Sequence, residues 1–196
     1  MSDPARRLAT YADLEAVPPH LVAEIIFGSL VTHPRPAPRH GASANSLGYE
    51  LTGPFQRGRG GPGGWIFVPE PELHLGSNVV VPDLAGWRRE RMPTLPATAW
   101  FETVPDWLCE ILSPSTEVYD RGAKRAIYAT HGLKHYWLLD PRVKVLEVFE
   151  LRQGQWLLLD TFAGDAMVAA APFAEVPFPL AALWPLDEPA PPAVAG

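Results

Sequence analysis

The sequence predicts an α+β protein with one domain over residues 1–184. Three observations favour this class: an apolar hairpin near the N-terminus, strand-like apolar runs on both sides of a helical segment, and an alternating β-meander near the C-terminus. Because 47% of the 196 residues are hydrophobic, the chain can bury a core within a single domain.

The first expected elements are a short helix and a hairpin. Thr10 is placed to cap a helix over residues 10–16, because its hydroxyl can accept a hydrogen bond from the first turn. Apolar runs at 21–26 and 29–32 flank Gly28, which can supply the positive φ of a tight turn.

The middle of the chain alternates between loops and strands. Residues 34–38 predict an extended proline-rich loop, 40–51 a weakly periodic helix, and 88–105 a surface excursion. The five glycines of 58–64 lack the Lys-Ser/Thr ending of a phosphate-binding loop, so we interpret them as a flexible turn. Apolar runs predict strands at 65–68, 72–75, 79–84 (continuing to 87), 106–112, 135–141, 144–151 and 155–161.

A helix is expected after Ser113, since the Ser-Pro-Ser-Thr sequence there is typical of a helix start. The helical spacing predicts a buried stripe formed by Ala123, Ala126, Ile127 and Thr130. It predicts a second, separate face formed by Asp120, Lys124 and Tyr128. Residues 173–183 predict a last edge strand and turn. The Pro- and Ala-rich tail, 185–196, is too poor in core residues to fold, and we expect it to be disordered.

The composition of the chain limits the cellular location and the binding partners that we expect. The single cysteine, Cys109, excludes an internal disulfide, and no signal peptide or long apolar run is visible, so we expect a cytoplasmic protein without membrane insertion. The formal charge of −6 argues against a protein that coats nucleic acid, although local phosphate contacts remain open. The candidates for such contacts are Arg57, Arg59, Arg88, Arg89, Arg91, Arg121, Lys124 and Arg125. The alternative is that these are scattered solvated charges.

Two acids on neighbouring predicted strands suggest a metal site. Asp83 ends one strand and Glu110 lies inside another. At about 4 Å apart, their repulsion at an effective dielectric near 20 is roughly 4 kcal/mol, so a proton or a divalent cation must relieve it. Mg²⁺ is commonly held by one or two carboxylates, and a nearby lysine, for which Lys124 is the candidate, could stabilise charge on a phosphoryl oxygen.

Four motifs in this order resemble the Uma-two family of restriction endonuclease-like proteins, within the PD-(D/E)XK nuclease superfamily. They are Pro82-Asp83, the segment 109–116 around Glu110, the segment 119–124 ending in Lys124, and 135–141. The likeness runs from about Glu24 to about Leu159. It implies a mixed central sheet flanked by helices (α/β/α-like), with a metal-bound active site that cleaves DNA phosphodiester bonds.

The resemblance also implies roles for individual residues. Asp83 and Glu110 match the metal-binding positions, with Mg²⁺ or Mn²⁺ as the ion. The superfamily lysine would fall at Leu112, an apolar residue, and the family takes it instead from the following helix, at Lys124. His40 matches a position near the site and would orient substrate or water. Three further residues are expected around the metal ligands without binding the ion: Glu24, Asp120 and Ser113.

Each of these residues also has a plain structural interpretation. Asp83 could accept turn hydrogen bonds, Lys124 could pair with Asp120 on a helix face, and His40 could be a capping or surface residue. Glu110 is harder to explain in this way, because a carboxylate between two leucines of one strand face is unfavourable unless it is paired.

Three functions stay open on the sequence. The first is a Mg²⁺-dependent endonuclease acting on DNA, which we expect to be a homodimer. The second is a catalytically silent relative that binds nucleic acid or a protein partner, which the acidic charge and the absent strand lysine favour. The third is a metal-dependent hydrolase of small phosphodiesters, without salt-sensitive DNA binding.

Overall fold

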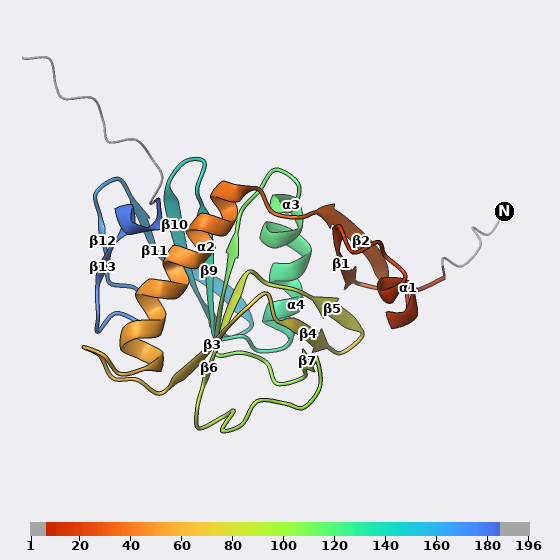
Figure 1. The fold of residues 1–196 in the computed structure, drawn as a ribbon, viewed down its shortest axis with the longest axis horizontal. Coiled ribbons are helices and arrows are strands. Elements are labelled where there is room, and N and C mark those ends of the chain that lie inside the picture. Colours follow the sequence, from red (N-terminus) through yellow and green to blue (C-terminus); the bar gives the residue numbers. More distant parts are fainter. Residues whose placement is uncertain (1–6, 185–196) are drawn as a thin grey trace, which may run out of the picture.

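A six-stranded mixed sheet lies at the centre of the computed structural model, which describes residues 7–184 (Figure 1). The strand order is β11-β10-β9-β8-β6-β3, and only β8 and β9 run parallel. The strands are β3 (Trp65–Pro69), β6 (Leu84–Arg88), β8 (Trp107–Ile111), β9 (His135–Asp140), β10 (Val145–Arg152) and β11 (Gln155–Ala163). The expected mixed sheet and C-terminal meander, β9 to β11, are confirmed.

A second sheet has five short strands in the order β2-β1-β5-β4-β7. They are β1 (Leu21–Ile26), β2 (Ser29–Pro34), β4 (Glu72–Leu75), β5 (Asn78–Val80) and β7 (Trp100–Phe101). The expected N-terminal hairpin is confirmed, with Phe27 and Gly28 both at positive φ in the turn. Strand β7 was not predicted from the sequence; it lies within the predicted surface excursion and pairs with β4.

Helices cover both faces of the six-stranded sheet (Figure 1). The helical segments are α1 (Tyr11–Glu15), α2 (Pro38–Leu51), the π-helical turn η1 (Thr52–Gln56), α3 (Glu117–Tyr119), the π-helical turn η2 (Asp120–Lys124), α4 (Arg125–Thr130) and the 3₁₀ turn η3 (Leu180–Leu183). Thr10 caps α1 as predicted, in a capping box with Asp13. None of the helices within residues 7–184 is long and apolar enough to span a membrane.

Side-chain alternation along β8 and β9 divides the core into two layers. Trp107 and Trp137 point to one face, where they belong to the same cluster as Leu47 and Leu51 of α2. On the other face, Leu108 and Tyr136 share a cluster with Ile127 and Tyr128 of α4. Glu110 follows Leu108 by two residues, so it faces α4 rather than α2.

The predicted continuous strand 79–87 is wrong, because residues 81–83 interrupt it and separate β5 from β6. Val81 donates its N–H to Glu24 Oε1 at 2.7 Å, and Pro82 has no N–H to donate. The ladder therefore ends, and the chain passes from the five-stranded sheet to the six-stranded sheet at Asp83.

The predicted apolar stripe of the helix after Ser113 is also corrected. Ala126 and Thr130 are exposed, whereas the buried face includes Asp120, Lys124 and Tyr128. The π-helical turn η2 holds more residues per turn than an α-helix, so it rotates the residues that follow and turns the polar face toward the sheet.

The C-terminal expectation is confirmed only in part. Within 173–183 the strand is limited to β13 (Phe178–Pro179), which pairs with β12 (Met167–Val168) and is followed by η3. The predicted disordered tail, 185–196, lies outside the described residues.

Candidate active site

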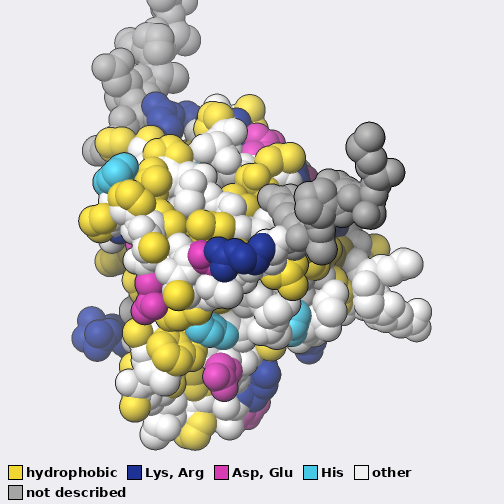
Figure 2. Space-filling model, turned by 90° about the vertical axis from the view of Figure 1, so that its right-hand side faces the viewer, with side chains coloured by type: hydrophobic (Ala, Val, Ile, Leu, Met, Phe, Trp, Pro, Cys, Tyr) yellow, Lys and Arg dark blue, Asp and Glu magenta, His cyan; other side chains and the backbone are white. Residues whose placement is uncertain are grey.

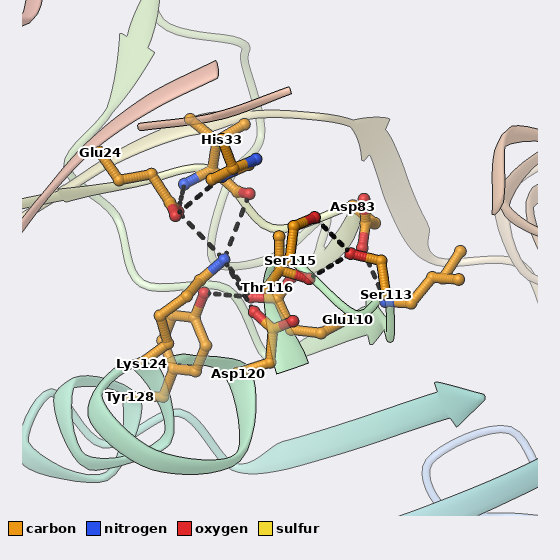
Figure 3. A network of polar contacts seen from close by, with 12 residues as sticks. Glu24, His33, Asp83, Glu110, Ser113, Ser115, Thr116, Asp120, Lys124 and Tyr128 are labelled. Carbon is orange, nitrogen blue, oxygen red and sulfur yellow. Dashed lines mark hydrogen bonds and ion pairs between the residues drawn. The ribbon is translucent and has the colours of Figure 1, made fainter. Parts of the chain in front are cut away.

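Three carboxylates surround one buried ammonium group, that of Lys124 (Figure 3). Lys124 Nζ lies 3.0 Å from Glu24 Oε1, 2.8 Å from Glu110 Oε1 and 3.4 Å from Asp120 Oδ1. The three acids come from β1, β8 and η2, so the cluster joins both sheets to the helical segment. Burial of all four side chains means that water screens little of their interaction.

Local structure explains how each acid reaches the cluster. Glu110 faces the helical segment, where Tyr128 donates its hydroxyl to Oε1 at 2.6 Å. Asp120 and Lys124 lie four residues apart on η2 and therefore share one face. Glu24 accepts the Val81 N–H through Oε1, and its Oε2 lies 3.4 Å from His33 Nε2.

Burial and mutual attraction or repulsion shift the pKa values of the charged groups in this cluster. Burial alone would raise the pKa of Glu24, but the Lys124 ammonium and the hydrogen bonds from His33 and Val81 outweigh it and hold that pKa at about 2. Burial and the neighbouring acids raise the pKa of Glu110 well above its ordinary value, against the pull of Lys124. Burial would lower the pKa of Lys124, yet the surrounding carboxylates raise it, so Lys124 stays protonated.

Asp83 is held between β8 and α2. Its Oδ2 accepts the backbone N–H of Ile111 at 2.6 Å, and its Oδ1 lies 3.2 Å from His40 Nε2. His40 stands in the first turn of α2, which begins at Pro38. Burial would lower the pKa of His40, but the hydrogen bond and charge of Asp83 raise it, which favours the imidazolium form.

The predicted site residues meet at one cavity of about 180 Å³. Its lining includes Asp83, His40, Glu110, Asp120 and Lys124. Ser113 also lines it, but its hydroxyl contacts Ser115 and Thr116 at 3.0 Å each rather than the carboxylates. Glu24 does not line this cavity but contacts Lys124, which does.

Two residues that contact this cluster, His33 and Tyr128, were not predicted as site residues. The hairpin register places Glu24 opposite Val31, so His33 is a diagonal neighbour on the same face of the sheet. Extending the predicted hairpin pairing to residue 33 would have placed His33 beside Glu24. Tyr128 was placed on the face of Lys124, but its hydrogen bond to Glu110 depends on how close the helix packs to β8.

The residue types fit a hard divalent cation. Carboxylate oxygens are the ligands that Mg²⁺ and Mn²⁺ prefer. Among the described residues, the buried Asp120 Oδ1 accepts no hydrogen bond, although it lies 3.4 Å from Lys124 Nζ. Within residues 7–184, however, no three His, Cys, Asp or Glu side chains are grouped as a metal cage. An ion would therefore rely on two of the carboxylates that line the cavity, Asp83 and Glu110, with water and substrate oxygens completing its shell.

The fold of this chain is shared with a solved protein that is described as a nuclease. A crystal structure described as "a putative nuclease belonging to DUF820", from Anabaena variabilis, superposes with a TM-score of 0.71 at 23% identity, covering 90% of this chain and 98% of that one. A Synechocystis protein described as "Uncharacterized protein slr1290" is 38% identical over 69 residues, which span 34% of this chain and 36% of that protein.

The profile of the Uma2 family, described as "Putative restriction endonuclease", matches residues 8–181. The chain belongs to this family. The resemblance inferred from the Pro-Asp, Glu110 and Lys124 motifs is thus confirmed, and family membership supports a nuclease role.

Proposed function

We propose that this protein is an endonuclease that uses Mg²⁺ or Mn²⁺ to hydrolyse phosphodiester bonds of DNA. The observation that carries the proposal is that Asp83 from the β5–β6 connection, Glu110 from β8 and Lys124 from η2 line one cavity. Such a group of two acids and one amine beside a solvent-reaching cavity suits phosphoryl chemistry, which needs positioning and charge stabilisation above all.

Asp83 and Glu110 would hold the ion. When bound, the metal supplies Lewis-acid polarisation of a phosphoryl oxygen and helps to generate the nucleophile from water. The Ile111 N–H and His40 fix the Asp83 carboxylate, and the Tyr128 hydroxyl fixes Glu110.

Lys124 would assist the attack as a cation. Because its pKa is raised, it keeps its proton and can donate a hydrogen bond to the attacking water or to a phosphoryl oxygen, where it stabilises negative charge. Glu24 holds the amine from behind. His40, through its contact with Asp83, would orient substrate or water at the mouth of the cavity.

The test uses variants that remove charge but keep side-chain size. Asp83→Asn and Glu110→Gln should abolish Mg²⁺-dependent cleavage of single-stranded DNA and nicking of supercoiled plasmid, while circular dichroism shows an intact fold. Asp165→Asn, an exposed acid outside the cavities described here, serves as the matched control and should cleave normally. Wild-type cleavage rates in both site variants would rule the proposal out.

A catalytically silent, binding-only protein is the second candidate. The observation that favours it is the position of Lys124, whose ammonium already neutralises part of the carboxylate charge that would attract a metal ion. Calorimetric titration with Mn²⁺ separates the two. The endonuclease should show binding heat that Glu110→Gln removes, whereas a silent protein should show none.

The predicted homodimer has a candidate surface on β11. Within residues 7–184 this strand pairs only with β10, which leaves its outer edge open, and Leu157, Leu158 and Leu159 are 43%, 48% and 37% exposed. Open edges with exposed apolar side chains favour pairing with another strand, here a second copy about a two-fold axis. Light scattering should give a dimer that Leu158→Asp converts to a monomer, while Val143→Asp, at another exposed apolar position, should leave it intact.

A further inference from the structure

A large groove extends from the candidate active site along α2. It has a volume of about 1050 Å³ and is lined by α2, η1, the start of the glycine-rich loop and the end of β3. Arg35, Pro36, His40 and Asp83 line both this groove and the smaller cavity with Glu110 and Lys124. A ligand lying in the groove would therefore reach Asp83 directly.

The helical side of the groove carries three glycines, of which Gly41 is exposed and the other two are half-buried. Gly41 and Gly48 of α2 and Gly53 of η1 line it, and a Cβ at each position would meet no atom within 4 Å. Glycine is disfavoured inside helices because of its backbone freedom, yet no packing neighbour excludes a side chain here. This bare surface lets a ligand approach the backbone closely, which a helix bearing longer side chains would prevent.

Two arginines of the groove have unpaired guanidinium groups within the described residues and can contact an anionic ligand. Arg57 and Arg59 are exposed, and within the described part of the chain neither guanidinium forms an ion pair or a hydrogen bond. Other arginines are paired with carboxylates, namely Arg7, Arg91, Arg121, Arg142 and Arg152. Glu50 and Glu70 also line the groove, so attraction would be local to the arginine end rather than general.

The groove also presents an aromatic ring to solvent. Tyr49, on α2, is 78% exposed, the largest exposure among the large apolar and aromatic side chains of residues 7–184. An exposed ring beside unpaired cations is the combination with which proteins bind single-stranded nucleic acids, the ring stacking on a base and the cations contacting phosphates. By contrast, Figure 2 shows Lys and Arg side chains scattered, not gathered, on the face of the molecule drawn there.

We propose that this groove binds a single strand of DNA, with Arg57 and Arg59 on phosphates and Tyr49 against a base, and delivers the strand to Asp83. The delivery step rests on the proposed nuclease function; the binding step does not. A single strand is favoured over a duplex because Glu110 and Lys124 are buried, 2% and 3% exposed. A flexible strand can bend its backbone into such a recess, whereas a stacked duplex keeps its phosphates on a convex surface.

Fluorescence anisotropy of a labelled 15-nucleotide DNA, titrated in EDTA over a series of salt concentrations, tests binding without cleavage. Arg57→Ala/Arg59→Ala should weaken single-strand binding at least tenfold. The slope of log K against log salt should fall by about 1.4, since each phosphate contact on a single strand contributes roughly 0.7. Tyr49→Ala should weaken binding by roughly 5- to 150-fold, the loss of one base stack, without changing that slope.

The matched control is Lys134→Ala/Arg152→Ala, which removes the same charge from exposed positions outside the groove and should bind as the wild type does. Tyr49→Phe keeps the ring and should also bind normally. Tighter binding of the blunt duplex of the same sequence, or equal losses in the arginine and control variants, would overturn the inference.

The same variants separate this inference from the proposed function. If Asp83→Asn binds the strand normally but does not cleave it, both stand. If Asp83→Asn still cleaves, the proposed site fails while the groove can be confirmed by the anisotropy series. If Arg57→Ala/Arg59→Ala binds and cleaves as the wild type does, the groove inference fails and the site survives.

Discussion

Lys124 Nζ and Glu110 Oε1 lie 2.8 Å apart, both side chains buried, between the helical segment and β8. The pair is part of a larger cluster in which Glu24 and Asp120 also approach the same ammonium. A single cation thus compensates several buried acids. It holds the site together, and it sets the charge that any added metal ion would meet.

Replacing Lys124 by methionine should destabilise the protein by about 3–5 kcal/mol at pH 7.5, because the buried carboxylates lose their cation. Part of this loss should be recovered at pH 5.5, where protonation relieves the repulsion. Urea unfolding at both pH values measures it. Lys134→Met, at an exposed position, should change stability by less than about 0.5 kcal/mol.

Acid stability should depend on Glu24. Its folded pKa of about 2 lies below the ordinary value of 4.5, so the unfolded chain binds more protons between these values. The contribution is therefore complete above pH 4.5 and is lost as the pH falls toward 2, with a size on the order of 3 kcal/mol. Unfolding curves from pH 6 to 2 should show a shallower acid dependence for Glu24→Gln; identical slopes would contradict the assignment.

Removing the Tyr128 hydroxyl should loosen Glu110. Tyr128→Phe deletes a 2.6 Å hydrogen bond to Oε1 and should lower the free energy of unfolding by about 1.5–3 kcal/mol, the range for bonds to charged groups. The affinity for Mn²⁺ should fall as well, which calorimetry can measure. Tyr119→Phe is the control, because within residues 7–184 the Tyr119 hydroxyl makes no hydrogen bond.

Two glycine substitutions should have opposite effects on stability. A Cβ at Gly86 would lie 2.9 Å from Phe67 Cε1 and 3.3 Å from Trp107 Cε3, so Gly86→Ala should cost about 1–3 kcal/mol through overpacking. Gly48→Ala, in α2 with no atom within 4 Å, should stabilise the protein by up to about 1 kcal/mol. Thermal unfolding of both variants tests this, and equal shifts of the melting temperature would refute the packing argument.

The elements that the sequence predicts well are those with strong local signals. Thr10 and Asp13 identify the start of α1, and the alternating runs around Gln153 and Gly154 identify the β10–β11 hairpin, whose turn has both residues at positive φ. Glu110 was also informative on local grounds, because a carboxylate between two leucines needs a partner, and the structure supplies Lys124 and Tyr128.

The features that local signals missed depend on tertiary contacts. Strand β5 ends where Val81 donates its N–H to Glu24. The residues around Val81 do not predict this hydrogen bond, because Glu24 is distant in sequence. The π-helical turn at 120–124 is also invisible to a 3.6-residue periodicity, and so the buried face was assigned to Ala126 and Thr130. The groove along α2 could not be foreseen, since it exists only where separate segments face each other.

The chain changes sheets at Val81–Asp83, and this crossing has a mechanical consequence. Glu24 anchors the peptide on one side through Val81, and Ile111 anchors it on the other through Asp83. Any sliding of the smaller sheet against the larger one must therefore displace the Asp83 carboxylate. A displacement of the N-terminal hairpin should therefore also move the carboxylate of the candidate site.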